Sequence, residues 1–238
     1  MYCEMDKKQR AIYDSTKKKF KEKILGMISE RGGVKNAAMY VLEGLLRLRQ
    51  ICDSPALIGE DELGDVAAES TKLVELMEHV TERTGNHKML VFSQFKGMLS
   101  LIRRELEDKG IPFCYLDGST SLNDRRKAVN NFQDDPKYRV FLISLKAGGT
   151  GLNLTAADYV YLMDPWWNPA VEQQAIDRAH RIGQKNHIFA YKMICKDSVE
   201  EKIIQLQDKK KAIAADLVTS DTGFMSSLSK SDIEFLFS

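Results

Sequence analysis

Short apolar runs alternate with helical patterns from Ser70 to about residue 200, and this alternation constrains the fold more than any other feature of the sequence. Runs such as Met89-Leu90-Val91-Phe92 are continuously apolar, which is typical of strands buried on both faces. Because parallel strands need crossover connections, usually helices, the pattern predicts an α/β fold whose parallel sheet carries helices on both faces. The expected strands are Met89–Phe92, Phe113–Leu116, Arg139–Ser144, Tyr159–Met163 and Ile188–Ile194.

Helical periodicity and capping signals occupy the intervals between these strands. Gly110 closes a helix after its last apolar residue, where a left-handed residue is favoured. Ser121 with Asp124, and Ser198 with Glu201, are spaced as capping boxes at two helix starts. The expected helices are Thr71–Arg83, one carrying Leu99, Ile102 and Leu106, one from Leu122 to Phe132, and one from Ser198 to about Leu217.

The first 68 residues show helical patterns without strands. Apolar residues recur at helical spacing up to Ile28, and Gly32-Gly33 interrupts the run. A second helix, from about Asn36 to Ile51, ends at Asp53-Ser54-Pro55 because the residue before a proline avoids the helical region. We therefore expect a helical protrusion and linker over residues 1–68, an α/β lobe over 69–200, and a C-terminal bracing helix and tail over 201–238.

Charge is balanced overall and uneven locally. Lys and Arg number 35 against 34 Asp and Glu, so the net charge of +1 predicts no global attraction to nucleic acid. Between Lys7 and Lys23, however, eight residues are basic and two are acidic. Such a run either contacts a phosphate backbone or forms a solvated helix face.

Cysteine spacing and hydropathy bear on the cellular context. The four cysteines lie far apart, without the paired spacing of a metal site, and fit reduced thiols in an intracellular protein. No apolar run approaches the roughly 20 residues of a membrane span. We expect an intracellular location, in the cytoplasmic nucleoid of a prokaryote or the nucleus of a eukaryote.

A helix with clear boundary signals is expected from Pro169 to Ile182. Asn168 supplies the N-cap, proline suits the first helical position, and Gly183 stops the helix. Its apolar stripe is Val171, Ala175, Ala179 and Ile182. A second stripe carries Gln174, Arg178 and Arg181, which suits an anionic ligand. Spacing alone equally allows the two arginines to pair with Glu172 or Asp177 on a solvated face.

A glycine-rich turn directly follows the apolar run Val140–Ile143, with Gly148, Gly149 and Gly151 around Thr150. It lacks the Lys-Ser/Thr pair that a P-loop uses to hold phosphates and Mg²⁺. It also fails the dinucleotide pattern, because Leu154 stands where a third glycine is required.

Several segments together resemble one family. Gln174–Gln184, QAIDRAHRIGQ, resembles the sixth helicase motif of Swi/Snf-type DNA-translocating ATPases, which belong to superfamily two of the helicase-like enzymes. The glycine-rich turn resembles their fifth motif, and Lys88–Phe95, KMLVFSQF, their fourth. Residues 45–55, LLRLRQICDSP, resemble the passage from a helical protrusion into the second motor lobe. The resemblance covers about residues 40–217 and implies a RecA-like C-terminal helicase lobe.

The resemblance also implies roles for individual residues. Arg178 and Arg181 match the arginine fingers that reach the γ-phosphate of ATP. The further ATP-binding positions are Gln174, Asp177, Gly149, Gly151 and Asn153. The DNA-binding positions are Ser93, Gln94, Gly118, Ser119, Thr120, Lys146, Thr150 and Trp166. The adjacent Trp166 and Trp167 either stack on bases or form a bulky loop that places the arginine helix near DNA, and we favour the loop.

Every matched motif belongs to the second of two motor lobes. Neither G-x-x-x-x-G-K-[ST] nor an acidic D-E-x-H-type box occurs in the sequence, although phosphoryl transfer needs a phosphate cradle and a metal carboxylate. We therefore expect ATP and Mg²⁺ to be held mainly by an N-terminal RecA-like lobe of the same, longer protein. The isolated chain is then inactive as an ATPase, and its other partner is double-stranded DNA. The alternative is a stand-alone, non-catalytic nucleic-acid or protein-binding module with the same fold.

Overall fold

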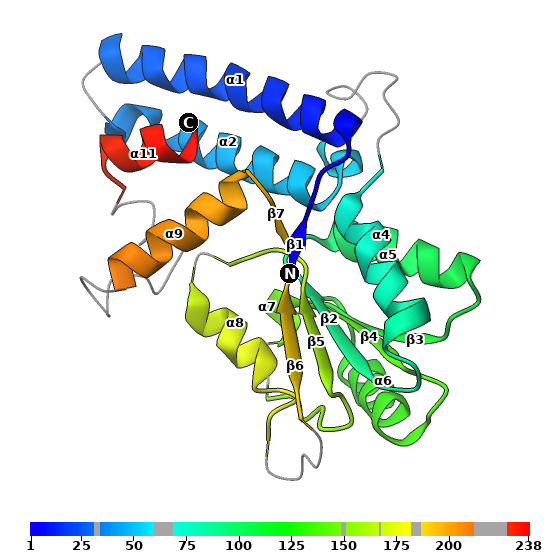
Figure 1. The fold of residues 1–238 in the computed structure, drawn as a ribbon. Coiled ribbons are helices and arrows are strands. Elements are labelled where there is room, and N and C mark those ends of the chain that lie inside the picture. Colours follow the sequence, from blue (N-terminus) through cyan, green and yellow to red (C-terminus); the bar gives the residue numbers. More distant parts are fainter. Residues whose placement is uncertain (31–33, 60–68, 149–150, 167, 182–186, 212–227) are drawn as a thin grey trace. The chain divides into compact units, whose positions relative to one another are not determined.

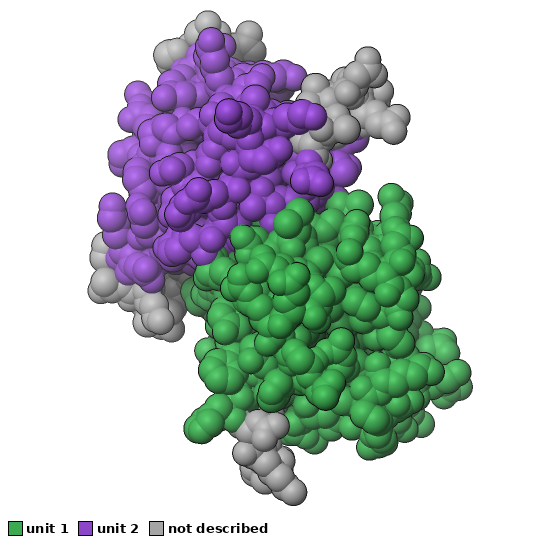
Figure 2. All heavy atoms as spheres, turned by 45° about the vertical axis from the view of Figure 1, so that its right-hand side comes forward, with its two compact units in different colours: residues 1, 72–193 green, residues 2–71, 194–238 purple. Residues whose placement is uncertain are grey.

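The computed structural model describes the chain except for residues 31–33, 60–68, 149–150, 167, 182–186 and 212–227 (Figure 1). It divides into two compact units, drawn in different colours in Figure 2. Unit 1 contains Met1 and Lys72–Met193, and unit 2 contains Tyr2–Thr71 and Ile194–Ser238. The expected N-terminal protrusion and the expected C-terminal segment therefore lie in the same unit.

Unit 1 is built on a five-stranded sheet in the order β3-β4-β2-β5-β6, and every pair of neighbouring strands is parallel. The strands are β2 (Met89–Ser93), β3 (Phe113–Leu116), β4 (Val140–Ser144), β5 (Tyr159–Leu162) and β6 (Phe189–Lys192). The predicted parallel sheet is thus confirmed. The strand expected over Ile188–Ile194 is two strands, because β6 ends at Lys192 and β7 (Ile194–Cys195) pairs elsewhere.

Helices cover both faces of this sheet. All five residues of β2 are buried, and successive side chains on a strand point to opposite faces. Leu90 and Phe92 share a core cluster with Phe132 of α6 (Leu122–Asp134) and Ala175 of α8 (Pro169–Ile176). On the other face, the Tyr161 hydroxyl lies 2.7 Å from Nδ1 of His79, in the π-helical turn His79–Arg83. The predicted α/β fold, a parallel sheet with helices on both faces, is therefore confirmed.

Two further helices of unit 1 lie close to their predicted positions, whereas the short helix Leu145–Gly148 was not predicted. The other helices are α4 (Thr71–Glu78), which continues into the π-helical turn, α5 (Lys96–Asp108) and the short α7 (Leu145–Gly148). The Ser121 side chain accepts from the backbone N–H of Asp124, as its N-cap role predicts. Gly110 follows α5 with φ at +63°, the left-handed region that glycine occupies without strain.

Unit 2 is mainly helical and joins the two ends of the chain. Its helices are α1 (Lys7–Glu30), α2 (Val34–Asp53), the 3₁₀ turn Pro55–Ile58, α9 (Val199–Lys211) and α11 (Lys230–Leu236). The two-residue strand β1 (Tyr2–Cys3) pairs in parallel with β7. Gly44 of α2 lets helices approach closely, because a Cβ there would lie 3.0 Å from atoms of Phe20 and Phe237. Ile233 and Leu236 of α11 are buried.

The strand order reverses at the centre of the sheet of unit 1. The chain leaves β2 toward β3 at one edge of the sheet, whereas it leaves β5 toward β6 at the other edge. Because β2 and β5 are neighbours, their carboxyl ends form a topological switch point. Open parallel sheets bind ligands at such points.

Candidate functional site

A buried carboxylate links the two strands at this switch point. Asp164 follows β5 by two residues and is fully buried. Its Oδ2 accepts from the Ser93 hydroxyl at 2.5 Å, and the backbone N–H of Gln94 lies 3.2 Å from both carboxylate oxygens. Ser93 is itself fully buried. The buried amide nitrogen of the Gln94 side chain has no hydrogen-bond partner within the described part of the chain.

A second carboxylate organises the turn after β3. Oδ1 of Asp117 accepts from the backbone N–H of Ser119 at 2.8 Å and from its hydroxyl at 2.6 Å. The Thr120 hydroxyl accepts from the backbone N–H of Asp117 at 3.0 Å, while Gly118 and Ser119 are exposed. Lys96 Nζ lies 2.8 Å from Asp117 Oδ2. Lys96 and the Ser119 hydroxyl hold the pKa of Asp117 well below its usual range.

The glycine-rich turn follows β4 and α7. Lys146 on α7 is exposed, as are Gly151 and Asn153. Gly151 has φ at +56°, a conformation that favours glycine. Gly149 and Thr150 lie outside the described residues. The turn is tied to the arginine segment, because the backbone N–H of Leu154 donates to the carbonyl of Arg178 at 2.9 Å.

The arginine helix starts as predicted and ends early. Asn168 caps it by accepting from the backbone N–H of Ala170 at 2.9 Å. It ends at Ile176, so the prediction that the helix runs to Ile182 is wrong. The backbone N–H groups of Arg178 and Ala179 reach back only three residues. This tighter turn buries Ala179 fully and directs the Arg178 carbonyl to Leu154.

Gln174, Arg178 and Arg181 consequently do not form a single helical face, so this prediction is wrong. Gln174 is on α8 and exposed, Arg178 is buried beyond the helix, and Arg181 is exposed. Asp177, the C-cap residue of α8, is exposed, and its Oδ1 accepts from the side-chain amide of Gln173 at 2.9 Å. Arg178 therefore differs in burial from Gln174 and Arg181, although helical spacing grouped the three.

Arg178 is a buried cation without a counter-ion among the described residues. It is 4% exposed, and its Nε has no hydrogen-bond partner within the same residues. Burial and the neighbouring charge of Arg181 lower the pKa of Arg178, which Asp177 partly offsets. A buried charge costs free energy unless it is paired, so this position suits an anionic ligand.

The Glu172 carboxylate interacts with the loop after β5 and with β6. Its Oε1 accepts from the backbone N–H of Trp166 at 2.8 Å, and its Oε2 forms an ion pair with Lys192 of β6. Trp166 is half-buried and packs against the core cluster, while Trp167 lies outside the described residues. Glu172 therefore fixes the loop between β5 and α8 instead of neutralising an arginine.

Three functional or supporting carboxylates were not predicted: Asp117, Asp164 and Glu172. Asp117 and Asp164 stand just after apolar strands, so their position at the carboxyl edge was visible in the sequence. Asp117 bonds with Ser119 in its own turn, but Lys96 and the partners of Asp164 lie far away in the sequence, and no sequence pattern names them.

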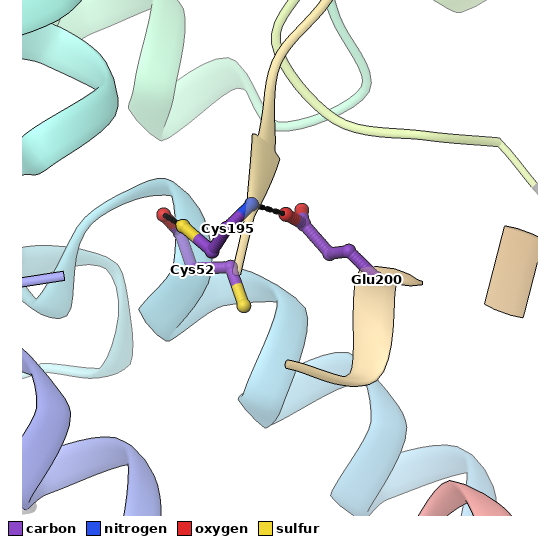
Figure 3. Close-up of side chains that lie close together, drawn as sticks. All are labelled: Cys52, Cys195 and Glu200. Carbon is purple, nitrogen blue, oxygen red and sulfur yellow. Dashed lines mark hydrogen bonds between the residues drawn. The ribbon is translucent and has the colours of Figure 1, made fainter. Parts of the chain in front are cut away.

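A separate buried cluster lies in unit 2. Cys52, Cys195 and Glu200 place their sulfur and oxygen atoms within 4.8 Å of one another (Figure 3). The backbone N–H of Cys195 donates to Glu200 Oε2 at 2.9 Å, and its thiol donates to the Cys52 carbonyl at 3.2 Å. These hydrogen bonds join the end of β7 to α2 and α9 and give the cluster a packing role.

Among the described residues, no helix combines the length and hydropathy needed to cross a membrane.

Comparison with known proteins identifies the family. The helicase conserved C-terminal domain family matches residues 71–183. The DNA repair protein rad5 of Neurospora crassa is 48% identical over 151 residues, which cover 62% of this chain and 12% of that protein. The chain spans between 12% and 22% of the length of the curated relatives it matches.

Solved structures agree over nearly the whole chain. The SWI2/SNF2 ATPase C-terminal domain of Sulfolobus solfataricus matches with a TM-score of 0.77 and 30% identity, covering 99% of this chain and 95% of that one. The SWI2/SNF2 ATPase core of the same organism in complex with double-stranded DNA matches with a TM-score of 0.80 and 30% identity, covering 99% of this chain and 48% of that chain. The chain belongs to the SWI2/SNF2 ATPases of helicase superfamily two and corresponds to their C-terminal helicase lobe.

Proposed function

We propose that this chain is the C-terminal motor lobe of an ATP-driven translocase on double-stranded DNA. In this proposal the lobe supplies Arg178 and Arg181 to the γ-phosphate of ATP and contacts the DNA backbone at the carboxyl edge of its sheet. The buried guanidinium of Arg178, whose Nε has no hydrogen-bond partner among the described residues, carries the proposal. Within a SWI2/SNF2 lobe, a polyphosphate is the anion that this cation is suited to bind.

The ATP-facing surface combines the arginine segment with the glycine-rich turn. The hydrogen bond from Leu154 to the Arg178 carbonyl holds the two segments together. The exposed side chain of Asn153 immediately precedes Leu154. The remaining proposed ATP contacts are Gln174, Asp177, Gly149 and Gly151.

The two arginines would stabilise negative charge that develops on the transferring phosphoryl group. Mg²⁺ does not fit the two carboxylates at this edge, because Asp117 and Asp164 already accept hydrogen bonds from neighbouring groups. We therefore assign the metal and most of the ATP contacts to the N-terminal RecA-like lobe.

The DNA-facing surface is proposed at the segments that follow β2, β3, β4 and β5. Hydroxyl, amide and ammonium groups on these segments suit phosphate oxygens, and such contacts carry no base sequence information. The proposed direct contacts are Gln94, Gly118, Ser119, Thr120, Lys146, Thr150 and Trp166. Ser93 is buried and bonded to Asp164, so we propose that it supports the turn and does not touch the phosphate.

Arginine substitutions in the ATPase core that contains this chain test the proposal. Removing an arginine finger lowers the rate by about 10³–10⁵-fold, and lysine should not restore it, because it lacks the planar guanidinium. Arg178→Ala, Arg181→Ala and the two lysine variants should therefore lose DNA-stimulated ATP hydrolysis. The matched control is Arg103→Ala, an exposed arginine that pairs with Glu107 within α5. Hydrolysis in Arg181→Ala and Arg178→Ala equal to that of the control would overturn the arginine assignment.

A stand-alone binding module is the alternative function. The isolated chain should hydrolyse ATP no faster than about 0.1 s⁻¹, well below ordinary enzyme rates, with or without duplex DNA. The motor proposal then requires hydrolysis to appear when the N-terminal lobe is present. If a protein carrying both lobes hydrolyses no ATP on DNA, the binding module is the better description.

A further inference from the structure

Two neighbouring strands of unit 1 end in a buried polar network that the family resemblance does not explain. Asp164 is fully buried after β5, and its carboxylate accepts from the Ser93 hydroxyl and the Gln94 backbone N–H after β2. The carbonyl of Met163, the residue before it, accepts from the buried ammonium of Lys72 at 2.6 Å. Lys72 thus binds the peptide carbonyl that precedes Asp164, and the Asp164 side chain bonds with the turn after β2.

The turn between β2 and α5 depends on this carboxylate. Phe95 is the N-cap of α5, and its side chain makes no capping hydrogen bond. In its place, the Ser93 hydroxyl accepts from the backbone N–H of Phe95 at 3.0 Å while donating to Asp164. A hydroxyl that both donates and accepts has its orientation fixed by its two partners. Asp164 therefore sets the conformation of residues 93–95 from a different strand.

This turn leads directly into groups that face the carboxyl edge. The Gln94 side chain is half-buried, and its amide nitrogen, which no described residue binds, is itself buried, so the side chain has to turn outward to reach a ligand. Lys96, the first residue of α5, pairs with Asp117 and so joins this turn to the Gly118–Thr120 turn. An amide N–H₂ is a suitable donor to a phosphate oxygen, and a small misplacement of such a donor weakens a hydrogen bond steeply.

We propose that Asp164 is a positioning residue for DNA binding, whose carboxylate holds the Ser93–Phe95 turn so that the Gln94 amide meets a backbone phosphate. The inference rests on the proposed function, because it assumes that this edge contacts DNA. Asp164 itself is buried and touches no ligand. Its carboxylate oxygens accept from two donors of the turn, whereas an uncharged amide would weaken these hydrogen bonds and present an N–H₂ donor in place of one oxygen.

Two substitutions and one matched control test this role in the ATPase core that contains the chain. Asp164→Asn keeps the volume of the side chain but turns one acceptor oxygen into a donor beside the Ser93 and Gln94 donors. Ser93→Ala removes only the hydroxyl. The control is Asp158→Asn, since Asp158 is a buried carboxylate at the opposite end of β5, where it pairs with His87.

The readouts are the dissociation constant for a random-sequence duplex DNA, the DNA concentration that half-saturates ATP hydrolysis, and the melting temperature. Losing a charge-assisted hydrogen bond should raise both DNA constants about tenfold or more in Asp164→Asn. The effect on the rate at saturating DNA should be smaller. Asp158→Asn should lower the melting temperature without changing either DNA constant, which separates positioning from general stability.

The inference is overturned if Asp164→Asn and Ser93→Ala bind DNA as tightly as Asp158→Asn at comparable melting temperatures. If Asp164→Asn does not fold, Ser93→Ala decides by the same comparison. Failure of the proposed function looks different, because the unsubstituted core would then bind no duplex DNA or Arg178→Ala would hydrolyse ATP normally.

Discussion

Glu172 offers the sharpest stability prediction, because one buried carboxylate supports the loop that leads to the arginine segment. Its side chain is 3% exposed, and Lys192, its ion-pair partner, is 40% exposed. In Glu172→Ala the backbone N–H of Trp166 loses its acceptor, which costs about 1–3 kcal/mol for a buried donor. The half-exposed ion pair adds at most about 1 kcal/mol.

The expected loss is therefore about 1–4 kcal/mol. For a chain of this size, 1 kcal/mol lowers the melting temperature by about 2–4 °C, so Glu172→Ala should melt roughly 2–16 °C lower. Glu172→Gln keeps an oxygen for the Trp166 N–H and loses only the ion pair, so its melting temperature should fall by about 2–4 °C.

Tryptophan fluorescence is the natural assay, because both tryptophans of the chain, Trp166 and Trp167, lie in this loop. Glu107→Ala is the control, since Glu107 is half-exposed and pairs with Arg103 one helical turn away. It should melt within about 2 °C of the unsubstituted protein. A Glu172→Ala midpoint as close to the unsubstituted protein as that of Glu107→Ala would refute the reasoning.

Three further predictions concern DNA binding, pH and backbone conformation. Affinity for random duplex DNA should fall steeply between about 50 and 200 mM salt if the contacts are to phosphates, and a salt-independent dissociation constant would contradict the proposed DNA surface. Burial lowers the pKa of His79, so the unfolded chain takes up a proton near pH 6.5 before the folded protein does, and stability should fall as pH drops from about 7 to 5. Urea midpoints should show a smaller loss over this range in His79→Gln, and an equal loss would exclude His79 as the cause. Gly110→Ala should cost about 1 kcal/mol in urea unfolding because its φ is +63°, although no heavy atom lies within 4 Å of the added Cβ. Gly26→Ala, at a helical glycine with equally open space, should not destabilise the protein, and equal losses would contradict the conformational argument.

Local patterns in the sequence were sufficient to predict most elements of the sheet. β2 and β4 are runs of apolar residues that are buried along their whole length, and a sequence can encode this without reference to other segments. Caps such as Ser121 and Asn168 are equally local. For these elements the periodicity, the capping residues and the observed fold agree.

The end of α8 could not be predicted from local patterns. Gly183 is a strong stop signal, yet the helix ends at Ile176. The competing interactions are the burial of Ala179 and the hydrogen bond from Leu154 to the Arg178 carbonyl. Leu154 lies far upstream in the sequence, so helical periodicity carries no information about it.

Only part of the candidate site was predictable, because the burial of some residues depends on contacts between segments that are distant in the sequence. Exposed residues, such as Ser119 on a turn and Lys146 on α7, could be proposed from the resemblance. The burial of Ser93 and Arg178 depends on which strands and turns become neighbours. Asp164 illustrates the limit, because its carboxylate bonds with residues that precede it by about 70 positions in the chain.

The division into two units has a consequence for the order of folding. Apart from Met1, unit 1 is one continuous segment, Lys72–Met193, whereas unit 2 combines Tyr2–Thr71 with Ile194–Ser238. In unit 2, β1 pairs with β7, and the Tyr13 hydroxyl accepts from the backbone N–H of Val199 across 186 residues. Closing so long a loop is slow, and chains are synthesised from the N-terminus. During synthesis, we therefore expect α1 and α2 to lack their C-terminal contacts until unit 1 has been made. We expect the folding of unit 1 to bring the two halves of unit 2 together, because it shortens the effective loop between them.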